Sequence, residues 1–172
     1  MKINLKKFDF VEMALGGKVR VGLDIGSYSV KFAQLSVDAS GVRVLKLGYK
    51  QIPQASRELT DKAAKMDVIV KLLRDLFKEN RLKSSEVRLA VSDPDVILRH
   101  VNVPKVSEEE LSKAVKWQAE KYISFPVEEA VVDFQTIGSG LAERAEQNEI
   151  IIVITRKEVV SRYLDIMSLA KL

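Results

Sequence analysis

Apolar side chains recur at every second position in the first part of the chain, which is the spacing of a β-strand with one buried face. The apolar residues of the first such run are Val19, Val21, Leu23 and Ile25. The alternation resumes at residues 30–35 and, after the turn residues 38–41, again at residues 42–47. The sequence therefore predicts three consecutive antiparallel strands joined by tight turns.

The apolar spacing changes to three and four positions between residues 61 and 80, which predicts a helix with one apolar face. Residues 48–59, which include Pro53, are predicted to form a loop before this helix. Alternation returns at residues 86–92 and predicts a fourth strand. Because a helix precedes this strand, we expect it to pair in parallel inside the sheet, which gives a βββαβ unit.

The run Asp-Pro-Asp at residues 93–95 predicts a turn and a domain boundary. Residues 19–93 then form one domain, and residues 94–172 form a smaller second unit with the order βαββα. Its strands are predicted at residues 96–103, 129–137 and 149–155, and its two helices follow the first and the last of these strands.

Two Ser/Thr-x-x-Glu patterns predict where the helices of the second unit begin. Ser107 with Glu110 precedes the first helix, and Thr155 with Glu158 precedes the second. In such a capping box the hydroxyl accepts a backbone N–H of the first turn, and the carboxylate reaches back to the cap. The acidic run at residues 108–110 is therefore explained by a helix N-terminus and requires no metal ion.

The turn between the first two predicted strands combines glycine, hydroxyl groups and charge. The residues concerned are Asp24, Gly26, Ser27, Tyr28, Ser29 and Lys31. Glycine lets backbone N–H groups approach anionic oxygens, the hydroxyls can donate hydrogen bonds, and the lysine supplies positive charge. Asp24 suits a hydrated Mg²⁺, which takes one or two protein carboxylates beside phosphates. The alternative is an ordinary β-hairpin with a Gly/Ser-rich turn and solvated charges.

The run DIGSYSVK, residues 24–31, resembles the first phosphate motif of the actin, Hsp70 and sugar-kinase superfamily. The longer run LDIGSYSVKFAQL, with the chain that follows, is similar to the PilM family of type IV pilus assembly proteins and more distantly to FtsA. The resemblance covers residue 19 to the end. It implies an α/β (α+β) fold of the actin-like ATPase (ribonuclease-H-like) type, in which the βββαβ lobe carries a small inserted βαββα subdomain.

The resemblance also implies ligands and partners. ATP with Mg²⁺ would bind the hairpin residues named above, with Asp24 on the metal. The full-length protein would be a cytoplasmic scaffold, peripheral at the inner membrane through partners. Those partners would be other pilus-machinery proteins and the N-terminal peptide of a PilN-like membrane protein, which docks in a groove beside the small subdomain. Self-association is a further expectation.

The N-terminal residues 1–18 are expected to be a basic, flexible lead-in to the first strand. Within them, Ile3-Asn4-Leu5 resembles the short peptide that PilN presents from its own N-terminus. This likeness gives the hypothesis that the segment docks in the partner groove of its own or a neighbouring copy.

An actin-like nucleotide site needs a second Asp-x-Gly hairpin and a purine-binding glycine-rich segment, and the sequence contains neither. We therefore expect the chain to be the amino-terminal portion of a longer protein, with no enzymatic activity of its own. One alternative is a small-substrate kinase of the same superfamily, which would also need a carboxylate base near the acceptor hydroxyl. An FtsA-like cell-division protein and a stand-alone peptide-binding domain are the others.

Composition excludes some classes of function. The chain has no cysteine and a single histidine, His100, so it has no disulfides, no thiolate metal sites and no His-rich metal site. Its net charge of +4 comes from interspersed charges, which does not indicate nucleic-acid binding. His100 is predicted to be structural. Trp117 is expected to be buried, with a role in a partner groove as the alternative.

Overall fold

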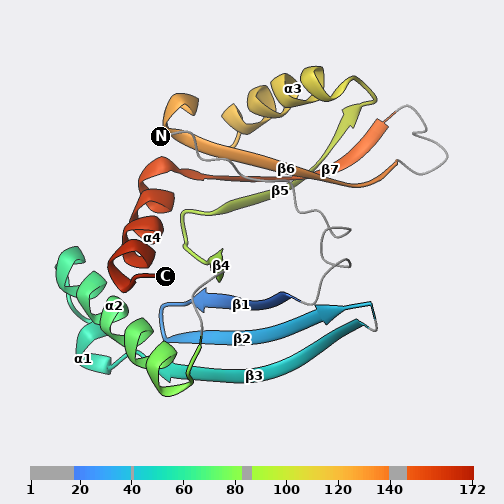
Figure 1. Ribbon diagram of the computed structural model, residues 1–172. Coiled ribbons are helices and arrows are strands. Elements are labelled where there is room, and N and C mark those ends of the chain that lie inside the picture. Colours follow the sequence, from blue (N-terminus) through green and yellow to red (C-terminus); the bar gives the residue numbers. More distant parts are fainter. Residues whose placement is uncertain (1–17, 40, 83–86, 140–146) are drawn as a thin grey trace. The chain divides into compact units, whose positions relative to one another are not determined.

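The computed structural model describes residues 18–39, 41–82, 87–139 and 147–172 (Figure 1). These residues form two compact units. The first unit contains the described residues up to Val91 together with Ile166–Leu172, and the second contains Ser92–Asp165. The segment with Ile3-Asn4-Leu5 and the centre of the predicted connection between residues 138 and 148 lie outside the described residues.

The first unit is built on a four-stranded sheet with the order β3-β2-β1-β4. Its strands are β1 (Lys18–Ile25), β2 (Ser29–Asp38), β3 (Gly41–Gln51) and β4 (Val87–Val91). The first three strands pair antiparallel in sequence, and β4 pairs in parallel with β1. These pairings are the predicted ones. Among the described strands, however, β4 lies at an edge of the sheet.

Helix α2 (Lys62–Glu79) begins and ends close to the predicted positions. The Asp61 carboxylate caps it by accepting the Ala63 N–H at 2.9 Å. The buried side chains of the helix form one stripe, which comprises Val70, Leu73, Leu76 and Phe77. The buried residues of the sheet alternate along β1 and continue on β2, and they comprise Val21, Leu23, Ile25, Val30 and Phe32. Together these residues are the core of the first unit.

The predicted loop at residues 48–59 is partly wrong. Strand β3 continues to Gln51, and a short helix α1 (Gln54–Arg57) follows it. The backbone pairing with the β1–β2 turn extends even to Ile52, whose N–H donates to the Tyr28 carbonyl at 2.9 Å. Pro53 stands at the N-cap of α1, where a residue without an N–H loses no helical hydrogen bond.

The second unit contains an antiparallel sheet with the order β5-β7-β6. Its elements are β5 (Ile97–Pro104), α3 (Glu108–Glu120), the 3₁₀ turn η1 (Val127–Glu129), β6 (Ala130–Ser139), β7 (Gln147–Arg156) and α4 (Lys157–Ala170). The last residues of α4, from Ile166, count with the first unit. The predicted order βαββα is therefore confirmed.

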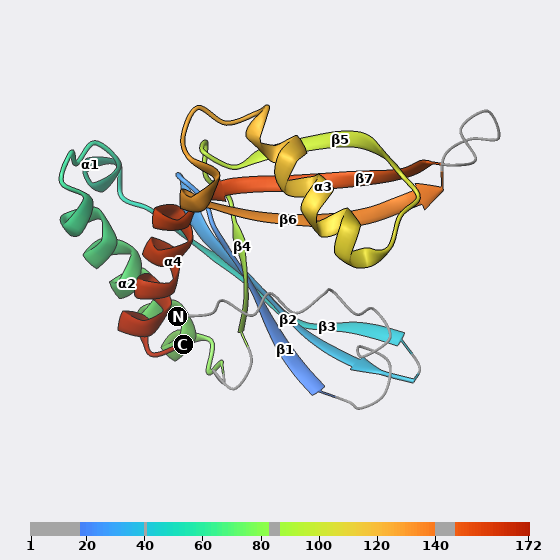
Figure 2. The ribbon, with the colours of Figure 1, turned by 90° about the horizontal axis from the view of Figure 1, so that it is seen from above.

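The core of the second unit lies between α3 and the sheet, and Figure 2 shows the helix lying over the strands. The central strand β7 contributes Ile150, Ile152 and Ile154, each with 0% of its surface exposed. The helix contributes its stripe of Leu111, Val115 and Ala119. Among the described helices, none combines the length and apolar character that crossing a membrane requires.

One predicted capping box is confirmed and the other is wrong. Ser107 donates its N–H to the Glu110 carboxylate at 3.1 Å, and its hydroxyl does so at 2.8 Å. These hydrogen bonds, the side-chain one foremost, hold the pKa of Glu110 below its usual value. Thr155 instead continues β7 opposite Val131, so α4 begins later, at Lys157. The Thr155 hydroxyl is buried and has no hydrogen-bond partner within the described structure.

Candidate functional site

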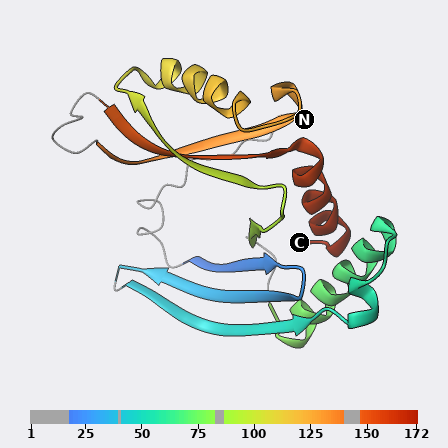
Figure 3. The same ribbon diagram turned by 180° about the vertical axis from the view of Figure 1, so that it is seen from behind.

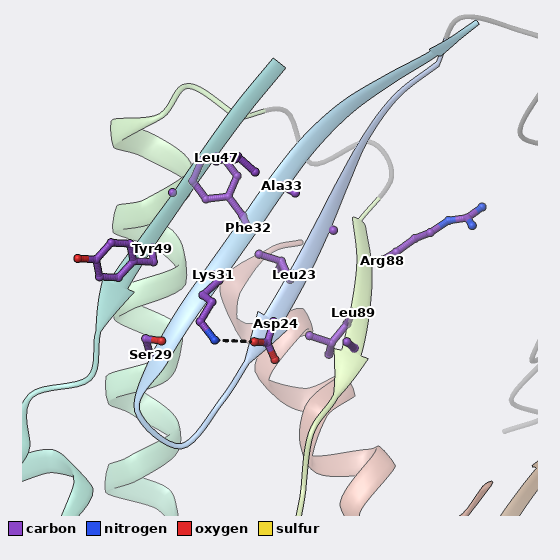
Figure 4. Close-up of a pocket in the computed structure, with 13 residues that line it drawn as sticks. Leu23, Asp24, Ser29, Lys31, Phe32, Ala33, Leu47, Tyr49, Arg88 and Leu89 are labelled. Atoms are coloured by element: carbon purple, nitrogen blue, oxygen red, sulfur yellow. Dashed lines mark hydrogen bonds and ion pairs between the residues drawn. The ribbon is translucent and has the colours of Figure 1, made fainter. Parts of the chain in front are cut away.

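The β1–β2 hairpin brings a carboxylate and an ammonium group together. Asp24 lies directly opposite Lys31 in the register, and Lys31 Nζ donates to Asp24 Oδ2 at 3.0 Å (Figure 4). Both side chains face solvent, with 59% of Lys31 and 39% of Asp24 exposed. An ion pair this exposed contributes about 0–1 kcal/mol to stability. The two groups are therefore accessible to a ligand, and their pairing costs little to break.

The turn itself is fixed by backbone contacts. The Gly26 N–H donates to the Ser29 carbonyl at 3.1 Å, and a Cβ on Gly26 would lie 3.4 Å from that oxygen. A side chain at position 26 would therefore be crowded. Ser27 and Tyr28 are exposed at the tip, whereas Ser29 is buried and already belongs to β2.

Tyr28 is held by elements that follow the hairpin in the chain. Its carbonyl accepts the Ile52 N–H, and the Arg57 guanidinium carbon lies 4.1 Å from the centre of its ring. A guanidinium at this distance over an aromatic ring makes a favourable cation–π contact. The start of α1 thus orients the tip of the turn.

The predicted site residues divide into two groups. Asp24, Ser29 and Lys31 line a pocket of about 1150 Å³ on the face of the sheet, whereas Gly26, Ser27 and Tyr28 form the turn and do not line it. Most of the remaining pocket surface is apolar, and Figure 4 shows its walls with Leu47 and Tyr49 from β3 and Arg88 from β4.

Sequence reasoning missed these pocket walls. The signal for Leu47 and Tyr49 was present, because the apolar alternation of β3 continues past residue 47, but we had ended the strand there. Arg88 comes from a strand 57 positions beyond Lys31 in the chain, and only the parallel pairing of β4 with β1 brings it to this face.

The donor set of the hairpin is suited to a hydrated metal ion with phosphates. The described residues contain no group of three His, Cys, Asp or Glu side chains that would form a protein cage for a metal. A single accessible carboxylate such as Asp24 is nonetheless what Mg²⁺ uses when water and phosphate oxygens supply its other ligands. The residues present therefore fit Mg²⁺ bound together with a polyphosphate.

Other candidate residues have structural explanations. His100 is exposed, and its Nδ1 lies 3.6 Å from Glu149 Oε1 on the neighbouring strand. Asp93 forms the predicted turn, because its carboxylate accepts the Asp95 N–H at 3.1 Å and also pairs with Arg162. The expected burial of Trp117 is wrong, since 76% of this side chain is exposed on α3.

Comparison with known proteins identifies the family. The family model described as type IV pilus assembly protein PilM matches residues 22–172. Among solved structures, the PilM–PilN type IV pilus biogenesis complex matches with 29% identity and a TM-score of 0.72, covering 91% of this chain and 46% of that chain. The cytoplasmic domain of EpsL, an inner-membrane component of the type II secretion system of Vibrio cholerae, matches with 16% identity and a TM-score of 0.49, covering 90% and 54%.

A protein of Bacteroides thetaiotaomicron with an actin-like ATPase fold also matches, with 13% identity and a TM-score of 0.46, covering 93% of this chain and 52% of that chain. The argument rests on the PilM matches, and the present chain spans about half the length of the PilM chain. The predicted α/β fold of the actin-like type is confirmed. Because the family model matches nearly all of the described chain, this chain belongs to the PilM family of type IV pilus assembly proteins.

Proposed function

We propose that the full-length protein containing this chain is a cytoplasmic scaffold of type IV pilus assembly. The observation that carries the proposal is the match to the PilM of the PilM–PilN complex over 91% of the chain. The scaffold would dock the N-terminal peptide of a PilN-like membrane protein and would be held at the inner membrane through it. Other pilus proteins and further copies of the chain are predicted additional partners.

We further propose that the β1–β2 hairpin binds ATP and Mg²⁺ in the full-length protein. Asp24 would hold the hydrated Mg²⁺, Lys31 would contact phosphate, and residues 26–29 would offer backbone N–H and hydroxyl groups to the same phosphates. Binding would exchange the 3.0 Å Asp24–Lys31 pair for contacts to the metal and the phosphates. When bound, Mg²⁺ would neutralise part of the phosphate charge. No observation in the described residues favours the kinase alternative.

The partner assignment is tested with the full-length protein and a fluorescein-labelled peptide. The peptide is the N-terminal segment of the PilN-like protein encoded by the same organism, and a scrambled peptide of the same composition is its control. Fluorescence anisotropy should show saturable binding of the native peptide alone. Equal binding of the two peptides, or binding of neither, would contradict the scaffold proposal.

A further inference from the structure

Strand β3 forms an outer edge of the first unit's sheet, as Figure 3 shows from behind. It is eleven residues long and contains no proline, and among the described residues no strand pairs with its far side. Every residue from Gly41 to Leu47 is exposed. A long, exposed edge of this kind is a template for the addition of another strand.

The backbone of β3 presents hydrogen-bonding groups outward at known positions. Tyr28 and Ile52 are directly opposite, and the Ile52 N–H donates to the Tyr28 carbonyl, so they form a hydrogen-bonded pair. Such pairs alternate with non-hydrogen-bonded pairs along an antiparallel ladder. Leu47 and Tyr49 occupy the second kind, opposite Ala33 and Lys31, so their N–H and C=O groups point away from β2.

The side chains of β3 form two rows with different chemistry. The first row is apolar and shares a face with Lys31 and Ala33. Its residues are Val42, Val44, Leu47 and Tyr49, and their exposed fractions are 57%, 55%, 70% and 72%.

The second row of β3 is basic and lies on the opposite face. Lys46 Nζ donates to the Asn80 carbonyl at 2.7 Å, and Lys50 Nζ pairs with the Glu79 carboxylate at 2.6 Å, both at the end of α2. Glu79 neutralises Lys50, so Arg43 and Lys46 leave this row positive. The strand itself contains no acidic residue.

We propose that the outer edge of β3 accepts an extended protein segment in which apolar residues alternate with acidic residues. Strand addition continues the two faces of the sheet, so alternate side chains of the added segment meet the two rows of β3. Apolar side chains would extend the row that contains Leu47 and Tyr49, and acidic side chains would meet Arg43 and Lys46. A second copy of β3 is disfavoured, because it would place the same cations against each other.

The test uses the 172-residue chain and a fluorescein-labelled peptide, Val-Glu-Val-Glu-Val-Glu-Val-Glu-Val. The control peptide has lysine at every glutamate position. Anisotropy should show saturable binding of the acidic peptide and at least roughly tenfold weaker binding of the basic one, because like charges would then face each other. No binding of the acidic peptide, or equal binding of both, overturns the proposal.

Two variants locate the binding to the edge of β3. Leu47→Pro removes an outward N–H and leaves the ladder to β2 intact, so it should abolish binding, whereas Leu47→Ala should retain it. Arg43→Glu changes only exposed charge and should weaken binding of the acidic peptide, which keeps the proposal testable if the proline variant misfolds. Unchanged binding to Arg43→Glu and Leu47→Pro overturns it.

The same measurements distinguish the other occupants. Binding that is seen only after deletion of residues 1–17 would show that this chain's own N-terminal segment occupies the edge, which contradicts the proposal. A dimer in sedimentation analysis that Leu47→Pro dissociates would identify a second copy as the occupant, which also contradicts it.

Discussion

Strands β3 and β7 use similar apolar sequences for different purposes. In β7, Ile150, Ile152 and Ile154 are fully buried, because the strand lies between two neighbours and beneath α3. In β3, Leu47 and Tyr49 are more than two-thirds exposed, because the strand lies at an edge and the apolar row is on the face away from α2. An apolar alternation therefore predicts a strand, but its place in the sheet decides whether its surface stabilises the fold or is available to a ligand.

This difference separates the two units of the chain. The second unit uses its apolar strands in its own core, and its most exposed large apolar side chain is Trp117 on α3. The first unit presents the Asp24–Lys31 pair and the apolar row of β3 on one open face. We therefore look for ligand chemistry in the first unit, and expect mutations in the central strand of the second to act mainly on stability.

The largest predicted effect is the contrast between two truncations to alanine. Ile152→Ala should lower the free energy of unfolding by about 2–5 kcal/mol, because it leaves a cavity under α3. Leu47→Ala is the matched control, and it should change stability by about 0.5 kcal/mol or less, because that side chain is exposed. Denaturant unfolding measures both, and equal losses for the two variants would refute the distinction between the strands.

A smaller effect is expected at Gly48, the one residue of the basic row that has no side chain. A Cβ there would lie 2.5 Å from Phe32 Cε1, and the buried Phe32 ring covers this glycine from the neighbouring strand. Gly48→Ala should therefore destabilise the chain by about 1–2 kcal/mol despite the better strand propensity of alanine.

Gly22→Ala is the matched control for this substitution, because the nearest atom to its added Cβ, the Ala33 carbonyl oxygen, is 3.9 Å away. It should leave the thermal midpoint almost unchanged. A Gly48→Ala midpoint as high as that of the Gly22→Ala variant would show that the Phe32 ring does not constrain the edge strand.

The elements that follow from local sequence were predictable. Ser107 and Glu110 lie one helical turn apart, so their capping box required no knowledge of the rest of the fold. The opposition of Asp24 and Lys31 likewise follows from a short hairpin between two alternating strands. Thr155 shows where this reasoning fails, because pairing with β6 extended β7 through the residue that the local pattern assigned to a helix cap.

The features that depend on distant residues were not predictable. The contact of Arg57 with Tyr28, and the positions of Tyr49 and Arg88 around the pocket, all arise from pairing between segments far apart in the chain. The exposure of Trp117 is similar, since the sequence of a helix does not show whether another element covers its outer face. The candidate site was therefore predicted as a motif, and its surroundings came from the fold.

The most direct test of the nucleotide proposal is calorimetric titration of ATP into the full-length protein and its Asp24→Asn variant, with Mg²⁺ and with EDTA. In Mg²⁺, Asp24→Asn should weaken ATP binding roughly ten- to a hundredfold, as expected when a group that holds a hydrated metal is lost. EDTA should weaken binding to the native protein and have little further effect on the variant.

Asp67→Asn, which removes the same charge from an exposed position on α2, is the control and should bind as the native protein does. Equal Mg²⁺-dependent affinity in the Asp24→Asn and native proteins would contradict the assignment of this hairpin as the nucleotide site.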